Sequence, residues 1–130
     1  MAKYVYPAKL SNDDGKMMVE FPDVPNCFTE GDTLTEAIEL AEDALCMILC
    51  DIEDKTKELP TPSDIATIKC EEGEVIAVVK ADTLSYRKRT NGKAVKKTLT
   101  IPAWLNEMAE QNKVNYSQIL QEALIQRLGQ

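Results

Sequence analysis

The 130-residue sequence contains no histidine. A Ser-His-Asp or Cys-His catalytic site therefore has no imidazole within this chain to act as its base. The five glycines are scattered, and none belongs to a glycine-rich phosphate-binding loop. No apolar run approaches the ~20 residues that a membrane-spanning helix needs, and the first residues lack the basic-then-apolar order of a secretory signal. These absences lead us to expect a soluble cytoplasmic protein that is not an enzyme.

Cysteines and carboxylates offer the remaining routes to metal chemistry. The cysteines are Cys27, Cys46, Cys50 and Cys70. They lack Cys-x-x-Cys spacing, so a zinc site would need distant parts of the chain to converge. We interpret them as small buried thiols of a reducing cytoplasm. A two-metal nuclease would need clustered carboxylates, for which the candidates are Glu20, Asp23, Glu30 and Asp32. We interpret these acids as a solvated rim and expect neither a metal nor another cofactor.

The net charge of −7 hides an uneven distribution. Residues 1–82 carry seven Lys/Arg against 19 Asp/Glu, a net charge of −12, whereas residues 83–130 carry eight against three, a net charge of +5. The basic side chains concentrate in a run without acids, made of Arg87, Lys88, Arg89, Lys93, Lys96 and Lys97. This asymmetry is typical of a basic nucleic-acid contact fused to an acidic module that suits a basic partner. A solvated linker is the alternative for the basic run.

Residues 1–82 predict an α+β domain with the element order β-β-β-α-β. Three short strands are expected first, at residues 4–10, 16–21 and 27–30. Thr33 and Glu36 then form a capping box that opens an amphipathic helix of roughly 20 residues. The last strand contains the continuous apolar run 75–79, which favours a buried central strand over an edge strand.

Residues 93–130 predict one strand followed by two helices. Side chains alternate along the strand, so that one face carries Val95, Lys97, Leu99 and Ile101 and the other carries Lys96, Thr98 and Thr100. Pro102 stands where the first helix begins, at a position that needs no N–H. Asn115 and Gln118 form a capping box for the second helix, whose apolar residues recur at helical spacing.

A unit below ~40 residues cannot usually bury enough apolar surface to fold alone, and a lone strand leaves its backbone groups unpaired. Two chains that pair these strands and interlock their helices meet both needs, with Trp104 and Tyr116 in the dimer core. The resulting two-stranded ribbon would fit the DNA major groove with its polar face. The alternative is an ordinary amphipathic strand and two helices packed on the preceding domain.

The alternating strand, the Pro102 helix start and the entry Asn115-Tyr116-Ser117 to the second helix resemble the ribbon-helix-helix DNA-binding family. The resemblance implies that the second helix presents its N-terminal amides to a DNA phosphate, in agreement with the general physics of helix N-termini. We predict that the base-reading residues are Lys96, Thr98 and Thr100. We predict that the phosphate-binding residues are Lys93, Lys97, Asn115 and Ser117.

Residues 21–27 (FPDVPNC), Gly31-Asp32-Thr33, Glu36-Ala37 and residues 59–63 (LPTPS) are similar to the HicB antitoxin family. One departure is Asn26, where the family commonly has glycine, although asparagine tolerates left-handed backbone. The resemblance implies an N-terminal domain with a partial RNase H-like fold that covers the active site of a small basic mRNA-cleaving toxin, HicA. It also implies a C-terminal domain that binds the operator of its own operon as a dimer.

Together these expectations divide the chain into an acidic toxin-binding domain (1–82), a basic linker (83–92) and a ribbon-helix-helix DNA-binding domain (93–130). The predicted toxin-binding residues, near the proline-containing loop, are Asp23, Glu30 and Asp32. Assembly beyond the homodimer stays open. Two other functions also stay open: a stand-alone ribbon-helix-helix repressor whose first domain senses a small ligand, and the metal-dependent nuclease considered above.

Overall fold

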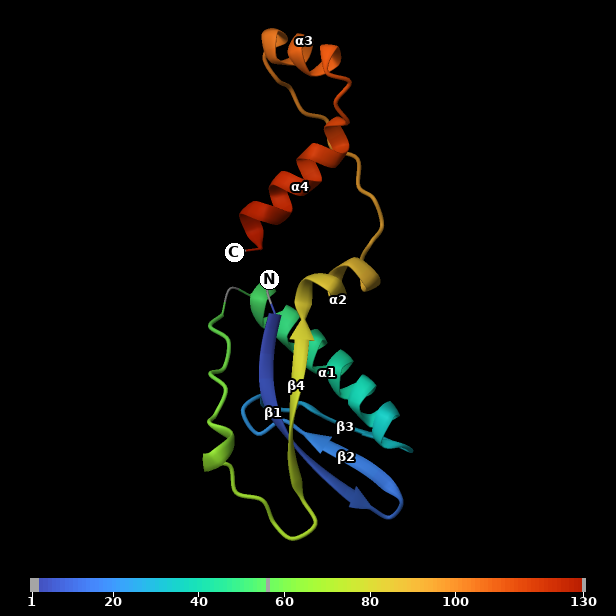
Figure 1. Ribbon diagram of the computed structural model, residues 1–130, viewed down its shortest axis with the longest axis vertical. Helices are drawn as coiled ribbons and strands as arrows, with labels where there is room; N and C mark the ends of the chain where they lie inside the picture. Colours follow the sequence, from blue (N-terminus) through green and yellow to red (C-terminus); the bar gives the residue numbers. More distant parts are fainter. Residues whose placement is uncertain (1–2, 56, 130) are drawn as a thin grey trace. The chain divides into compact units, whose positions relative to one another are not determined.

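The computed structural model describes residues 3–55 and 57–129. The chain divides into two compact units, Met1–Thr90 (unit 1) and Asn91–Gln130 (unit 2). Unit 1 combines a four-stranded sheet with the helices α1 and α2, and unit 2 contains the helices α3 and α4 (Figure 1). No helix in the described part of the chain combines the length and the apolar character that crossing a membrane requires.

The sheet of unit 1 is antiparallel, with the strand order β3-β2-β1-β4. Its strands are β1 (Lys3–Asp13), β2 (Lys16–Glu20), β3 (Phe28–Gly31) and β4 (Val75–Asp82). Asp14 and Gly15 connect β1 to β2 with φ values of 52° and 82°, as a two-residue hairpin turn of type I′ requires. Asn26 also has a positive φ, of 61°, so asparagine does adopt the left-handed backbone here. The predicted order β-β-β-α-β is confirmed.

The position of β4 corrects one prediction. The apolar run 75–79 predicts a central strand, but β4 lies at the end of the sheet and pairs with β1. Val75 and Val78 are accordingly 61% and 50% exposed, whereas Val79 and Ala81 are buried. A continuous apolar run indicates that both faces of a strand carry apolar residues. It does not indicate whether both edges are paired, because strand order depends on the rest of the fold.

The core of unit 1 lies between the sheet and α1 (Leu34–Asp54), which crosses one of its faces (Figure 1). The Thr33 hydroxyl accepts a hydrogen bond from the Glu36 N–H at 3.1 Å, so the predicted start of this helix is confirmed. Gly31 lies directly beneath the first turn, where an added Cβ would come within 2.6 Å of the Ala37 backbone nitrogen. Glycine therefore permits the close approach of β3 to α1. The buried side chains include Tyr6, Ala8, Leu10, Val19, Ala41, Leu45, Leu49 and Val79.

The connection from α1 to β4 is held against the rest of unit 1 by side-chain hydrogen bonds. The Tyr6 hydroxyl donates to the Pro60 carbonyl at 2.6 Å. The Ser63 backbone N–H donates to the Asp23 carboxylate at 2.8 Å, and the Ser63 hydroxyl donates to the same carboxylate. A short 3₁₀ turn, η1 (Ile65–Thr67), follows and is capped by the Asp64 side chain. These contacts join the two proline-containing loops.

Residues 83–92 differ from the predicted basic linker, because most of them form helix α2 (Thr83–Thr90), which packs on α1. Arg87 forms ion pairs with Glu53 at 3.1 Å and Asp54 at 2.9 Å. Arg89 forms an ion pair with Asp43 at 2.7 Å. The three carboxylates all belong to α1, so these two guanidinium groups contribute to the fold of unit 1.

The Glu53 carboxylate joins three elements of unit 1. It accepts hydrogen bonds from the Tyr4 hydroxyl at 2.8 Å, the Thr83 hydroxyl at 3.1 Å and the Arg87 guanidinium at 3.1 Å. Burial alone would raise the pKa of Glu53, but hydrogen bonds from donors that include Tyr4 and Arg87 hold this pKa below its ordinary value. Burial, reinforced by the bond to Glu53, raises the pKa of Tyr4 to about 12.

We expect the free energy of unfolding to fall as the pH rises from about 10 to about 12. The Tyr4 phenol loses its proton near pH 10 in the unfolded chain and near pH 12 in the folded chain. Its contribution to stability is therefore complete below pH 10 and disappears as the pH approaches 12. Urea unfolding of the wild type and of Tyr4→Phe across this window measures the contribution, and the variant should show the smaller decrease. Equal decreases in the two proteins would contradict the assignment.

Candidate functional site

Unit 2 carries its apolar side chains on its surface. Its helices α3 (Ala103–Gln111) and α4 (Tyr116–Leu128) bury none of their residues. Apart from the half-buried Val114, the large apolar side chains from position 95 onward range from 36% exposed at Leu120 to 79% exposed at Val95. Burying one such side chain fully is worth about 1.5–3 kcal/mol. A single copy of unit 2 therefore leaves most of its hydrophobic stabilisation unused.

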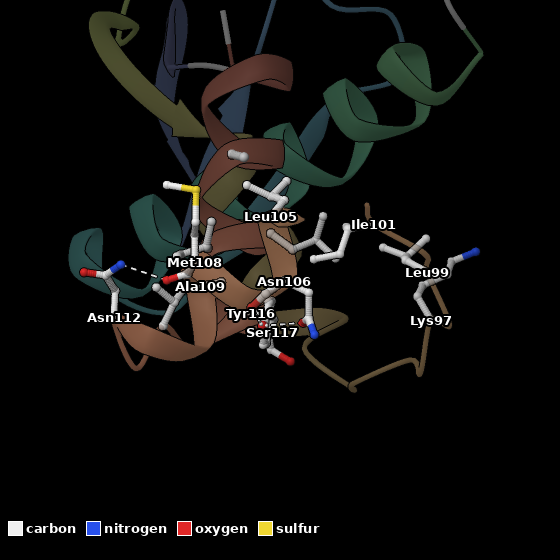
Figure 2. A pocket seen from close by; sticks show the side chains of 14 residues that line it. Lys97, Leu99, Ile101, Leu105, Asn106, Met108, Ala109, Asn112, Tyr116 and Ser117 are labelled. Atoms are coloured by element: carbon white, nitrogen blue, oxygen red, sulfur yellow. Dashed lines mark hydrogen bonds between the residues drawn. The ribbon is translucent and has the colours of Figure 1, made fainter. Parts of the chain in front are cut away.

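The exposed apolar residues surround a groove of about 840 Å³ within unit 2 (Figure 2). Leu99 and Ile101 line it from the extended segment before α3, and Leu105 and Met108 line it from α3. Ile119, Leu120 and Ala123 line it from α4. The groove is thus an open apolar surface to which each part of the unit contributes.

Residues 93–102 have no regular secondary structure in the single chain, so the predicted strand is not formed there. A strand needs a partner for its backbone N–H and C=O groups, and no described segment supplies one. Of the four residues predicted to share one face, Lys97, Leu99 and Ile101 line the groove, whereas Val95 does not and is 79% exposed. The predicted base-reading residues stay exposed outside its lining; they are Lys96, Thr98 and Thr100.

The predicted phosphate-binding residues occupy different positions in unit 2. The Asn115 side chain caps α4 by accepting a hydrogen bond from the Gln118 N–H at 3.1 Å. The Gln118 side chain donates to Glu122 at 3.1 Å, so the reciprocal bond of a capping box is replaced by a bond within α4. Ser117 lies in the first turn of α4 and, like Lys97, lines the groove. Lys93 is exposed before the extended segment.

One contact that positions α4 is not predicted from the sequence. The Tyr116 hydroxyl donates to the Asn106 side-chain oxygen at 2.7 Å and approaches the Asn106 backbone oxygen at 3.3 Å. This contact ties the start of α4 to the middle of α3. Helical spacing marks Tyr116 only as an apolar residue, and no local pattern relates it to an asparagine ten positions earlier. The contact follows from the turn between the helices, where Lys113 has a φ of 52°.

The acidic residues predicted to contact a protein partner have separate environments in unit 1. Asp23 is half-buried and binds Ser63, and Asp32 forms an ion pair with Lys16. Glu30 is exposed on the edge strand β3. Within residues 3–55 and 57–129, no three His, Cys, Asp or Glu side chains gather where they could hold a metal ion. Three of the cysteines are buried as predicted, but the prediction is wrong for Cys70, which is exposed in the connection before β4.

Comparison with curated proteins identifies two informative relatives. Antitoxin HicB 2 of Photorhabdus laumondii is 41% identical over 58 residues, which are 45% of this chain and 42% of that protein. The chain therefore spans less than half of that relative's length in the alignment. An uncharacterized 14.9 kDa protein of Haemophilus phage HP1 is 32% identical over 110 residues, which are 82% of this chain and 80% of that protein.

Both units contribute to the wider similarity. A chain from the toxin–antitoxin complex of Streptococcus pneumoniae aligns with a TM-score of 0.63 and 26% identity, covering 96% of this chain and 99% of that one. The family model described as the HicB-like antitoxin of bacterial toxin–antitoxin systems matches residues 6–124. Because that match extends over most of unit 1 and most of unit 2, this chain belongs to the HicB-like antitoxin family.

Proposed function

We propose that this chain is the antitoxin of a toxin–antitoxin pair and the repressor of its own operon. Unit 1 covers the active site of a small basic mRNA-cleaving toxin of the HicA type. Unit 2 binds operator DNA as a homodimer through a ribbon-helix-helix arrangement. The observation that carries this proposal is the family match from residue 6 to residue 124, which includes both units.

The apolar surface of unit 2 supports the homodimer. In the proposed arrangement, the extended segments of two chains pair into a ribbon, which satisfies the backbone groups that one chain leaves unpaired. Leu99 and Ile101 then turn toward the combined helices, since they already line the groove with residues of α3 and α4. Each copy covers the apolar surface of the other.

The same pairing places the polar face of the ribbon outward. Lys96, Thr98 and Thr100 share this face, and a two-stranded ribbon fits the major groove, where lysine and threonine can contact base edges. The N-terminus of α4, capped by Asn115, supplies backbone amides to a phosphate near Ser117. The long side chains of Lys93 and Lys97 add cationic contacts to the DNA backbone. These are the DNA contacts of the proposal.

The charge of unit 1 supports a basic protein partner. Residues 1–90 carry ten Lys/Arg against 19 Asp/Glu, and the basic residues Arg87 and Arg89 are already paired with α1. Complementary potentials accelerate encounter and suppress wrong pairings. We place the toxin contact near Asp23, Glu30 and Asp32. Of the three, Glu30 is the exposed residue for whose carboxylate no hydrogen-bond or ion-pair partner lies among the described residues.

Replacing Thr98 by alanine should relax the sequence preference of DNA binding. Removal of one base-reading side chain is expected to reduce discrimination by about 1–3 kcal/mol, with little change in binding to unrelated DNA. Fluorescence anisotropy with the chain's own promoter and with a scrambled duplex measures both affinities. Lys93→Ala is the matched control. It should weaken binding to both duplexes and lower the salt dependence by ~0.9 for each phosphate that the lysine neutralises. If Thr98→Ala weakened binding to both duplexes equally, its role as a base-reading residue would be contradicted.

Charge reversal at Glu30 should weaken binding of the basic partner encoded beside this chain's gene. Glu30→Lys places a cation on the proposed contact surface, and like charges across an interface disfavour binding. Glu72→Lys makes the same change in the exposed turn before β4 and should leave binding unchanged. Isothermal titration calorimetry with the neighbouring gene product compares the two variants. Equal affinities for the variants would move the interface away from β3, and the absence of such a neighbouring gene would contradict the antitoxin proposal.

A further inference from the structure

Asn91 and Gly92 form an Asn-Gly dipeptide, which occurs once in the sequence. Both residues are exposed and lie outside helix and strand, directly after the last residue of α2 (Figure 1). No hydrogen-bond partner for the Asn91 side chain or for the Gly92 N–H lies among the described residues. Neither group is therefore held in a fixed conformation by such a bond.

An asparagine side chain can react with the backbone nitrogen of the residue that follows it, and asparagine is a thermolabile residue for this reason. Once a base has removed the Gly92 amide proton, the nitrogen attacks the side-chain carbonyl carbon of Asn91. The new C–N bond closes a five-membered succinimide ring, and the side-chain nitrogen leaves as ammonia. Glycine favours this closure because it has no Cβ to crowd the ring.

Water then opens the succinimide ring at one of its two carbonyl carbons. Addition at the side-chain carbonyl breaks its bond to the Gly92 nitrogen and gives aspartate. Addition at the main-chain carbonyl gives isoaspartate, in which the backbone runs through the former side chain. Both products carry a carboxylate where Asn91 has a neutral amide. The two steps consume one water, release one ammonia and need neither an oxidant nor a reductant.

The structure separates Asn91 from the other asparagines of the chain. The side chains of four of them form hydrogen bonds, which ring closure would have to break; these are Asn12, Asn106, Asn112 and Asn115. The fifth, Asn26, precedes the buried Cys27, whose N–H donates to the Val24 carbonyl at 3.3 Å. Ring closure at Asn26 would therefore need a nitrogen that is both buried and already bonded. These restraints favour reaction at Asn91.

We propose that Asn91-Gly92 is a site of spontaneous deamidation, and that the carboxylate it creates weakens DNA binding as the chain ages. The modification itself depends on the local backbone alone. Its effect on DNA rests on the function proposed for unit 2. Asn91 is the first residue of that unit and stands two positions before Lys93, one of the proposed phosphate contacts.

The new carboxylate changes the charge at the start of the basic segment. Lys88 before it and Lys93 after it are both exposed. Two residues of chain span at most about 7 Å, which is within the Debye length of about 8 Å at physiological ionic strength. A carboxylate at position 91 therefore repels a phosphate that binds Lys93. At this separation in water, the Coulomb energy of one like-charge pair corresponds to a loss of affinity of about threefold.

Mass analysis of peptides from the full chain, after incubation at neutral pH, tests the modification. Asn91 should convert to aspartate and isoaspartate, whereas the other five asparagines keep their amides. Gly92→Ala should slow the conversion about tenfold, because a Cβ crowds the ring. Asn91→Gln is the matched control, since it keeps an amide whose closure needs a less favourable six-membered ring. No conversion at Asn91, or equal conversion at the other asparagines, would overturn the proposal.

Fluorescence anisotropy with the full chain tests the consequence for DNA binding. At physiological ionic strength, Asn91→Asp should bind the promoter and a scrambled duplex about threefold more weakly than Asn91→Gln, because the repulsion acts on phosphates and not on bases. High salt should remove the difference. Equal affinities of the two variants at physiological ionic strength would overturn the proposed effect. Absence of any binding by the unmodified chain would instead contradict the function proposed for unit 2, and the mass analysis would decide the modification independently.

Discussion

Most large apolar side chains of unit 2 stay exposed within the described part of that unit, and this constraint shapes the behaviour of the protein. Its two helices bury none of their residues, and the segment before them has no backbone partner among the described residues. Hydrophobic burial and backbone pairing are the two requirements of a stable fold, and the second copy of the proposed homodimer would supply both at once. The polar face that reads DNA in the proposed function is then a consequence of the pairing, since alternation sends every second side chain outward.

Unit 1 meets the same requirements within a single chain. Its sheet and α1 enclose a continuous core, and Glu53 connects β1, α1 and α2 through one carboxylate. Arg87 and Arg89 of α2 form ion pairs with carboxylates of α1, and these pairs hold α2 against α1. The carboxylates that remain on the surface leave unit 1 strongly acidic, a property that suits the basic partner proposed for it.

Local signals account for the parts of the fold that the sequence predicts. Thr33 specifies the start of α1 because its hydroxyl caps the helix, as the sequence predicts. The short hairpin between β1 and β2 is likewise local, because Asp14 and Gly15 both adopt positive φ. Helix α2 is not predicted because the residues of α1 with which it pairs lie more than 30 positions earlier in the chain. The edge position of β4 is not predicted because an apolar run carries no information on strand order. Similarly, the bond between Asp23 and Ser63 depends on two loops meeting.

Hydrogen exchange of the backbone amides at residues 95–101 in the full chain tests the pairing of unit 2 most directly. If two copies pair these segments, their amides exchange slowly, and the protection increases with protein concentration because it depends on association. If unit 2 remains a single copy, the same amides stay open to water. Fast exchange at every concentration, with the sheet of unit 1 protected in the same sample, would contradict the pairing.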